Sequence, residues 1–186
     1  EPLALRTARL KCERFYATSD PSPLVSVYIP TYNRAQLLAE RSIPSILAQT
    51  YRHFELIVVG DSCTDSTAEV VARFKDPRIR FFNLPKRSYR YPPTAENHWL
   101  AGPVVPANEA LRLVQGRWIA RLDDDDTWDP LHLETSLEFA RKGGYEFVSA
   151  LFVEERDGTR RVVDGFHAAS SYYTRRDGES GEGSPK

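Results

Sequence analysis

Four short, mostly apolar runs alternate along the chain with segments of helical periodicity, and no other feature constrains the fold as strongly. Each run has the length and the β-branched or aromatic content of a buried strand. Strands that alternate with helices form a mainly parallel sheet flanked by helices, so the sequence predicts an α/β fold. The predicted strands are residues 24–29, 54–59, 79–82 and 118–122.

Helical patterns follow the predicted strands. Pro44 lies inside the first pattern and should kink that helix, because proline cannot donate a backbone hydrogen bond. Ser66 and Glu69 match a capping box at the start of the second. Gly116 should end the third. The predicted helices are residues 35–49, 66–74, 106–115 and 130–142, the last with Leu133, Leu137 and Ala140 on one face.

We expect one main domain over residues 24–165, preceded by an N-terminal extension, residues 1–23. Near its end, a strand over residues 145–153 is predicted to pair with residues 160–163 across a turn. Residues 166–186 have the composition of a flexible segment. The proline-rich and aromatic residues 83–105 predict a long irregular loop, a kind of segment that is often functional.

Four consecutive carboxylates, Asp123 to Asp126, directly follow the fourth predicted strand. Like charges at this spacing raise one another's pKa, and a cation among them relieves the repulsion. Carboxylate oxygens suit Mg²⁺ or Mn²⁺, which take further ligands from water and substrate phosphates. The alternative is a solvated acidic loop. Three polar loops, at residues 30–34, 60–65 and 123–127, should meet at the carboxyl edge of the sheet, which favours a ligand site.

Composition and charge exclude several classes of partner. The net charge of −1 gives no general attraction to nucleic acid. No apolar stretch is long enough for a transmembrane segment. The four histidines and two cysteines lack metal-ligand spacing, and a reducing, cytoplasmic setting is predicted.

Several separate motifs resemble family 2 glycosyltransferases with the GT-A fold, whose nucleotide-binding half is Rossmann-like. They agree with that family in order and spacing over residues 24–150. They are Val25-Ser26-Val27-Tyr28-Ile29-Pro30-Thr31-Tyr32-Asn33-Arg34, Phe54-Glu55-Leu56-Ile57-Val58-Val59-Gly60-Asp61, Asn108-Glu109-Ala110-Leu111, Gly116-Arg117-Trp118-Ile119 and Leu122-Asp123-Asp124-Asp125-Asp126-Thr127-Trp128-Asp129-Pro130.

The resemblance implies roles for individual residues. Asp61 would accept a hydrogen bond from a uracil N–H, and the residues that hold the base with it are Pro30, Thr31, Tyr32 and Asn33. The acidic run corresponds to the family's D-x-D motif, in which Asp124 would bind the ribose and Asp125 the metal, Mn²⁺ or Mg²⁺. Asp123 and Asp126 would share these contacts or support them. Of the two, Asp123 is predicted to contact both the nucleotide and the metal.

The implied activity is metal-dependent transfer of a sugar from a nucleotide-diphosphate sugar, a UDP-sugar, with inversion. The acceptor would be a hydroxyl group on a glycan or lipid-linked sugar in polysaccharide biosynthesis, reached at the inner face of the membrane. The catalytic residue is unknown, because the family's general base would lie beyond residue 186. This chain would then be the donor-binding half of a longer enzyme, and residues 166–186 would be a flexible segment or the start of the acceptor half.

Two departures from the family pattern are visible. Gly60-Asp61-Ser62 stands where two acids are usual, and Ala107-Asn108 stands in place of Arg-Asn. A non-catalytic nucleotide-sugar-binding module is an alternative, which the missing acceptor half favours. A sugar-phosphate nucleotidyltransferase is a further alternative, which the glycine-free loop at residues 30–34 disfavours.

Overall fold

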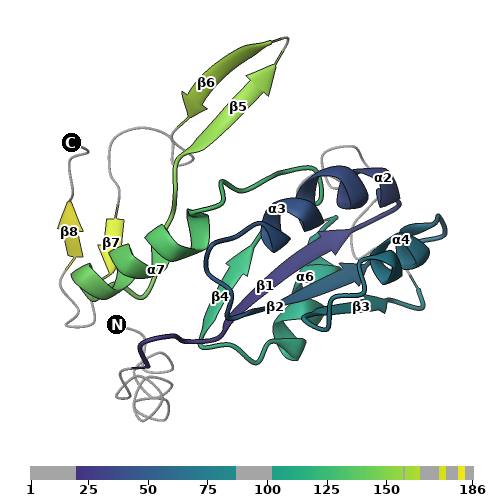
Figure 1. Ribbon diagram of the computed structural model, residues 1–186, viewed down its shortest axis with the longest axis horizontal. Coiled ribbons are helices and arrows are strands. Elements are labelled where there is room, and N and C mark those ends of the chain that lie inside the picture. Colours follow the sequence, from purple (N-terminus) through teal and green to yellow (C-terminus); the bar gives the residue numbers. More distant parts are fainter. Residues whose placement is uncertain (1–19, 87–101, 157, 164–171, 175–179, 183–186) are drawn as a thin grey trace. The chain divides into compact units, whose positions relative to one another are not determined.

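The computed structural model describes residues 20–86, 102–156, 158–163, 172–174 and 180–182 (Figure 1). The chain forms two compact units. The first comprises Glu1–Ala48 and Arg52–Trp128, and the second comprises Gln49–Tyr51 and Asp129–Lys186. Most of the N-terminal extension and of the long loop predicted at residues 83–105 lies outside the described residues.

The first unit is built on a four-stranded parallel sheet in the order β3-β2-β1-β4. β1 and β2 occupy the middle, and every residue of both is buried, as expected for strands covered on both faces. β3 and β4 form the edges. The strands are β1 (Val25–Thr31), β2 (Phe54–Gly60), β3 (Ile79–Asn83) and β4 (Trp118–Arg121). The predicted α/β fold with a mainly parallel sheet is confirmed.

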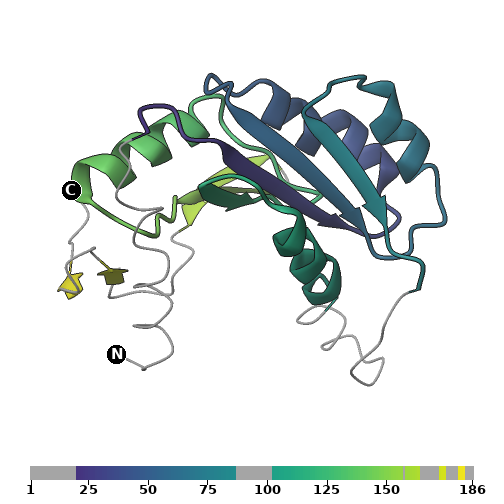
Figure 2. The same ribbon diagram turned by 90° about the horizontal axis from the view of Figure 1, so that it is seen from below.

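Helices cover both faces of this sheet (Figure 2). α6 (Val104–Leu113) lies on one face, where Ala107 and Ala110 join a core formed with Tyr28, Ile57 and Val59. The opposite face carries α4 and a continuous helical segment made of α2, η1 and α3. These elements are α2 (Ala35–Leu37), η1 (Leu38–Ser42), α3 (Ile43–Leu47) and α4 (Thr67–Arg73).

The helical segment after β1 differs in detail from the kinked helix predicted at Pro44. Pro44 lies in the first turn of α3, and a π-helical turn, η1, precedes it. The Ile43 N–H bonds to the Leu38 carbonyl, five residues back. A wider turn of this kind lets the chain continue past a residue that cannot donate a backbone hydrogen bond.

The start of α4 also differs from the prediction. Ser66 makes no side-chain cap, so the predicted capping box is wrong. Asp65 takes over this function, because its Oδ1 accepts hydrogen bonds from the Thr67 N–H at 3.1 Å and the Thr67 hydroxyl at 2.5 Å. Burial raises the pKa of Asp65, but these bonds and one from the Ala35 N–H outweigh it, so the net shift is downward.

The second unit contains α7 (His132–Gly143), in which Leu133, Leu137 and Ala140 are buried as predicted. The helix ends where Gly144 adopts a left-handed conformation, with φ of 64°. Burial lowers the pKa of His132 at the helix start.

The strand predicted over residues 145–153 is largely wrong. Tyr145 folds back on α7: its N–H donates to the Ala140 carbonyl at 2.9 Å, and its ring stacks on Phe139 with centroids 5.1 Å apart. A strand therefore starts only at β5 (Phe152–Arg156), which pairs antiparallel with β6 (Thr159–Val163) as expected for the predicted hairpin.

A further two-stranded antiparallel pair lies in the segment predicted to be flexible. It consists of β7 (Tyr172–Thr174) and β8 (Ser180–Glu182). These two strands are the described part of residues 166–186, and the assignment of this segment as flexible or as the start of the acceptor half stays a prediction.

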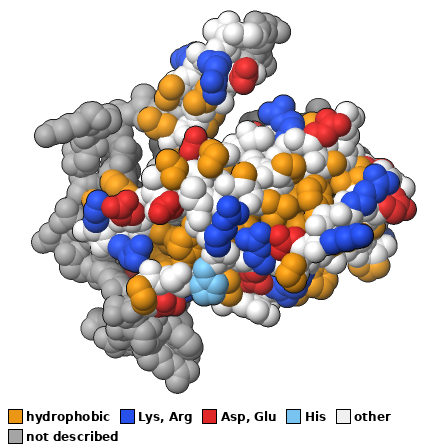
Figure 3. Space-filling model, viewed as in Figure 1, with side chains coloured by type: hydrophobic (Ala, Val, Ile, Leu, Met, Phe, Trp, Pro, Cys, Tyr) orange, Lys and Arg blue, Asp and Glu red, His pale blue; other side chains and the backbone are white. Residues whose placement is uncertain are grey.

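Two surface properties complete the description. None of the helices in the described ranges has the length and apolar character needed to cross a membrane. Acidic and basic side chains are intermixed on the face shown in Figure 3.

Candidate functional site

The loops that follow β1, β2 and β4 meet at the carboxyl edge of the parallel sheet, as the sequence predicted. Thr31 pairs with Gly60 at the ends of β1 and β2, and Arg121 ends β4 beside Tyr28 of β1. The ladder continues past the strands, because the Asp61 N–H donates to the Thr31 carbonyl at 2.8 Å. Pro30 and Thr31 consequently belong to β1 and not to the loop in which they were predicted.

Asp124 fastens the acidic run to the end of β1. Its Oδ2 accepts the Thr31 hydroxyl at 2.7 Å, and the Tyr32 N–H also bonds to this carboxylate. Its carbonyl accepts the Ser42 hydroxyl at 3.3 Å. Burial raises the pKa of Asp124 and Asp125 adds to the rise, while Thr31, Arg34 and the Tyr32 N–H oppose it. Asp124 thus holds the loop in place with at least one of its two oxygens.

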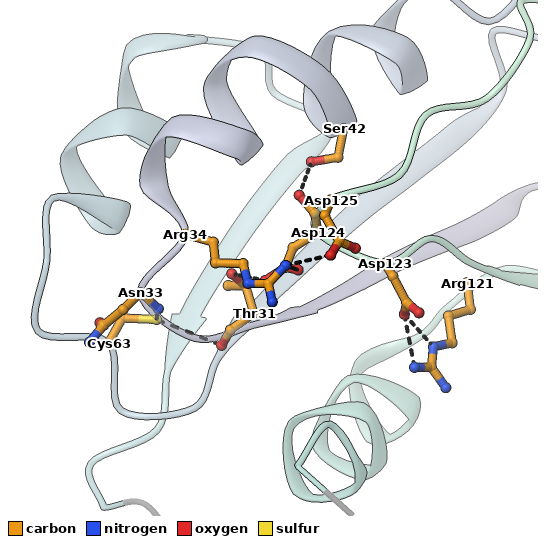
Figure 4. Close-up of polar contacts among 9 residues, drawn as sticks. All are labelled: Thr31, Asn33, Arg34, Ser42, Cys63, Arg121, Asp123, Asp124 and Asp125. Carbon is orange, nitrogen blue, oxygen red and sulfur yellow. Dashed lines mark hydrogen bonds and ion pairs between the residues drawn. The ribbon is translucent and has the colours of Figure 1, made fainter. Parts of the chain in front are cut away.

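Asp125 lies in a different environment, shown in Figure 4. Its side chain is 50% exposed, and its Oδ2 lies 2.5 Å from Nη1 of Arg34. The same nitrogen lies 3.5 Å from Oδ1 of Asp124. The hydrogen bond to Asp125 raises the pKa of the Arg34 guanidinium, so this cation is firmly charged.

Asp123 is directed away from Arg34 and toward Arg121 (Figure 4). Nε and Nη2 of Arg121 lie 2.9 and 2.8 Å from the same Asp123 oxygen. The fourth acid, Asp126, has a raised pKa because of desolvation and the neighbouring carboxylates, and Arg41 partly offsets this. The aspartates of the run therefore lie in different surroundings, although Asp124 and Asp125 share Arg34.

Asn33 connects the loop after β1 to the loop after β2. It adopts a left-handed conformation, with φ of 52°. Its Oδ1 accepts the Thr64 N–H at 2.8 Å, and its Nδ2 donates to the Thr64 hydroxyl at 3.2 Å. The neighbouring Tyr32 is 37% exposed, whereas Asp61 is buried. Among the predicted base-binding residues, Asn33 is engaged in holding the loops together and Tyr32 presents a ring at the surface.

Asn83, which the sequence reasoning missed, supports the loop after β2 from the end of β3. Its amide oxygen accepts the Cys63 N–H at 2.8 Å, and its amide nitrogen donates to the Cys63 carbonyl at 2.9 Å. Gly60 permits this approach, because a Cβ there would lie 2.6 Å from Oδ1 of Asn83. The signal available in the sequence was its position: a polar residue ending a parallel strand.

Cys63 fills a small space in the loop after β2. It is partly buried, and its Sγ lies 3.4 Å from the Asn33 nitrogen. Burial raises the pKa of the thiol, so it is not a preformed thiolate.

The donor atoms at this edge suit a hard divalent cation that completes its shell with other ligands. Within the described ranges, no group of three or more His, Cys, Asp or Glu side chains is arranged to hold a metal by itself. Asp125 nevertheless offers a half-exposed carboxylate, whereas the other predicted ligand, the partly exposed Asp123, is turned toward Arg121. Magnesium sites commonly use one or two carboxylates together with waters and substrate phosphates. The carboxylates of the acidic run therefore fit such an ion.

Comparisons with known proteins give a consistent result. The sequence model described as Glycosyl transferase family 2 matches residues 26–91 and 96–183. The colanic acid biosynthesis protein WcaA of Escherichia coli K12, a putative glycosyl transferase, is 36% identical over 118 residues. This match covers 62% of the present chain and 37% of the length of WcaA. The putative teichuronic acid biosynthesis glycosyltransferase TuaG of Bacillus subtilis is 34% identical over 140 residues, 74% of this chain and 50% of its own.

A third relative has a more specific name. It is the Escherichia coli UDP-Glc:alpha-D-GlcNAc-diphosphoundecaprenol beta-1,3-glucosyltransferase WfgD, 34% identical over 125 residues, 67% of this chain and 44% of its own. The chain thus spans about a third to a half of the length of these relatives.

Solved structures share the fold. Staphylococcus aureus TarS 1-349 in complex with UDP has a TM-score of 0.56 and 26% identity, over 66% of this chain and 33% of that one. The mannosyltransferase PcManGT of Pyrobaculum calidifontis, solved with GDP-Man and Mn²⁺, has a TM-score of 0.52 over 75% of this chain and 41% of that one. At 23% identity, this second likeness concerns the fold alone.

Proposed function

Because the chain belongs to glycosyl transferase family 2, we propose that it provides the donor-binding half of an enzyme that transfers a sugar from a UDP-sugar to a hydroxyl acceptor. The observation that carries this proposal is the meeting of three polar loops at one sheet edge. Hydrogen bonds join Thr31 to both Asp61 and Asp124, so the predicted base and D-x-D residues occupy one location. The 26% identical structure solved with UDP supports a uridine nucleotide.

The base would lie at the ends of β1 and β2. Tyr32 presents an exposed ring that can flank a planar base. We propose that the Asp61 carboxylate accepts the uracil imide N–H, while Pro30 and Thr31 form the floor at the strand end. Asn33 would act on the base through the loop that it holds.

The diphosphate would lie over the acidic run. Asp124 would approach the ribose through Oδ1, since Oδ2 is bound by Thr31. Asp125 would hold a divalent cation, Mn²⁺ or Mg²⁺, and Asp123, which Arg121 engages, would share this contact or support it. When bound, such an ion neutralises the charge that develops on the leaving diphosphate.

The name of a relative suggests the acceptor, and the family resemblance suggests the catalytic base. WfgD is named for a lipid-linked acceptor, so we propose a glycan or lipid-linked hydroxyl here. We also propose inversion, with a general base in the part of the enzyme that follows residue 186, and a cytoplasmic location beside the membrane. Cell fractionation of the native protein would test the location.

Calorimetric titration of UDP into the 186-residue protein, with and without Mn²⁺, tests the donor site. We expect binding that depends on Mn²⁺. Asp125→Ala should remove the metal dependence, and Asp61→Ala should weaken UDP binding more than Mn²⁺ binding. Asp76→Ala is the matched control, because Asp76 pairs with Arg78 outside the three loops. Absence of UDP binding both in this chain and in a longer chain carrying the following residues would refute the proposal.

Transfer itself requires a second assay. UDP release from a UDP-sugar by the longer chain in the presence of a hydroxyl acceptor would show a transferase. Binding without release in either chain would instead identify a nucleotide-sugar-binding module.

A further inference from the structure

We propose that Arg34 is an internal counter-cation that competes with the divalent metal for Asp125 and thereby sets the metal affinity of the site. This inference rests on the proposed metal-dependent donor site. It concerns a residue to which neither the family resemblance nor the comparisons assign a role.

The contacts of Arg34 place its charge on the predicted metal ligand. Nη1 lies 2.5 Å from Oδ2 of Asp125 and 3.5 Å from Oδ1 of Asp124. A metal ion bound to Asp125 would use oxygens of this same carboxylate. Two cations cannot both approach one carboxylate oxygen at bonding distance without strong repulsion. Metal binding and the Arg34–Asp125 ion pair therefore oppose each other.

The backbone of Arg34 is anchored, whereas its side chain can move. The Arg34 carbonyl accepts the Leu38 N–H at 3.1 Å, and the next residue is held by Asp65. The side chain is 45% exposed, and that of Asp125 is 50% exposed. Water can solvate the guanidinium when it leaves, so the exchange needs a side-chain movement only.

The charge balance of the acidic run points to the same residue. Four aspartates, Asp123 to Asp126, face three arginines that contact them or act on them through charge: Arg34, Arg41 and Arg121. A divalent ion added to this arrangement would make the cluster net positive unless one arginine withdrew. Arg121 holds Asp123 through two nitrogens within the same segment. Arg34 holds Asp125, so Arg34 is the arginine that a metal on Asp125 displaces.

Titration of Mn²⁺ into nucleotide-free protein, followed by the electron paramagnetic resonance signal of free Mn²⁺, tests the competition. Exposed ion pairs change an equilibrium constant by up to about fivefold, so Arg34→Gln should bind Mn²⁺ about two- to fivefold more tightly than wild type. Arg34→Lys keeps the charge and should lie between the two. Arg112→Gln removes the same charge from an ion pair with Glu109 on α6 and should change the affinity by less than about 1.5-fold.

A second measurement follows Arg34 directly in wild-type protein, by nuclear magnetic resonance. Titration of wild-type protein with Mg²⁺ should shift the side-chain Nε resonance of Arg34, identified with Arg34→Lys, toward that of a solvated arginine. By linkage, a metal that competes with Arg34 must release it.

The outcomes separate this inference from the proposed function. If wild type binds Mn²⁺ while folded Arg34→Gln binds it equally or more weakly, the competition is refuted and the metal site stands. An Arg34 resonance unmoved by saturating Mg²⁺ also refutes it. If neither wild type nor any variant binds Mn²⁺, with or without UDP, both the metal site and the competition are refuted.

Discussion

Substitution of Glu55 provides a quantitative test of how the sheet is held at its amino end, opposite the candidate site. Glu55 is buried in β2 and accepts three kinds of donor. Its Oε1 lies 2.5 Å from the Ser26 hydroxyl and 2.7 Å from the Gln115 N–H, and its Oε2 lies 2.6 Å from Nη2 of Arg80. Arg80 also donates to the Leu113 carbonyl at 2.8 Å, so the network joins β1, β2 and β3 to the end of α6.

Glu55→Gln keeps the size of the side chain but replaces one acceptor oxygen with an NH₂ group. That group must then face a donor, either Arg80 or the pair formed by Ser26 and Gln115. Hydrogen bonds to charged groups contribute about 1.5–3 kcal/mol, and a buried donor left without an acceptor costs about 1–3 kcal/mol. Because Arg80 is partly exposed, we expect a loss of about 2–3 kcal/mol in the free energy of unfolding.

The assay is thermal and urea unfolding of wild type and variant, monitored by circular dichroism. For a chain of this size, each kcal/mol lowers the melting temperature by about 2–4 °C, so a decrease of about 4–12 °C is expected. Glu109→Gln is the matched control, because Glu109 forms a surface pair with Arg112 and should lose about 0.5 kcal/mol or less. Equal losses in the two variants would refute the network argument.

The pH dependence adds an independent check. Burial raises the pKa of Glu55, but the bonds from Ser26, Gln115 and Arg80 outweigh it and hold the pKa below its usual value of 4.5. The stabilisation is therefore present above pH 4.5 and is lost as pH falls through the folded-state pKa. The difference in the free energy of unfolding between wild type and Glu55→Gln should therefore shrink as the pH falls below 4.5. A difference that stays constant down to pH 3 would contradict this assignment.

Three further predictions concern the candidate site. Asn83→Ala removes the two hydrogen bonds that hold the Cys63 backbone. Calorimetry should show UDP binding weakened about three- to tenfold, with the Mn²⁺ affinity within about twofold of wild type. Equal loss of both affinities would contradict a local role of Asn83 in the loop. Gly60→Ala places a Cβ 2.6 Å from Oδ1 of Asn83 and should lower the free energy of unfolding by about 1–3 kcal/mol in urea titrations, whereas an unchanged midpoint would show that the loop yields freely. Thr31→Val removes the hydroxyl that donates to buried Asp124 and should cost about 1–3 kcal/mol in the same assay; a neutral or stabilising result would mean that Asp124 finds another donor.

Much of the fold could be predicted because its signals are local. The buried strands are continuous apolar runs, and Leu133, Leu137 and Ala140 recur at the helical period that α7 buries. The errors arose where a tertiary contact outweighed the local pattern. Stacking of Tyr145 on Phe139 draws the chain back onto α7, so the strand predicted from residue 145 begins at Phe152.

The location of the candidate site was likewise determined by sequence, because topology places the carboxyl ends of parallel strands at one edge. Asp61 and the acidic run were predicted there from their positions after strands. Asn83 follows the same rule and could have been found with it.

Only the tertiary structure decided what each aspartate of the run does. Asp124 and Asp125 are chemically identical neighbours, yet one is buried against Thr31, 93 residues away in sequence, and the other is exposed against Arg34, 91 residues away. Their solvation and partners come from β1 and the helical segment that follows it. The sequence therefore determined where carboxylates gather, through strand order and local pattern. Folding alone buried one of them against Thr31 and paired the other with Arg34, because partners so distant in sequence meet only when the sheet has formed.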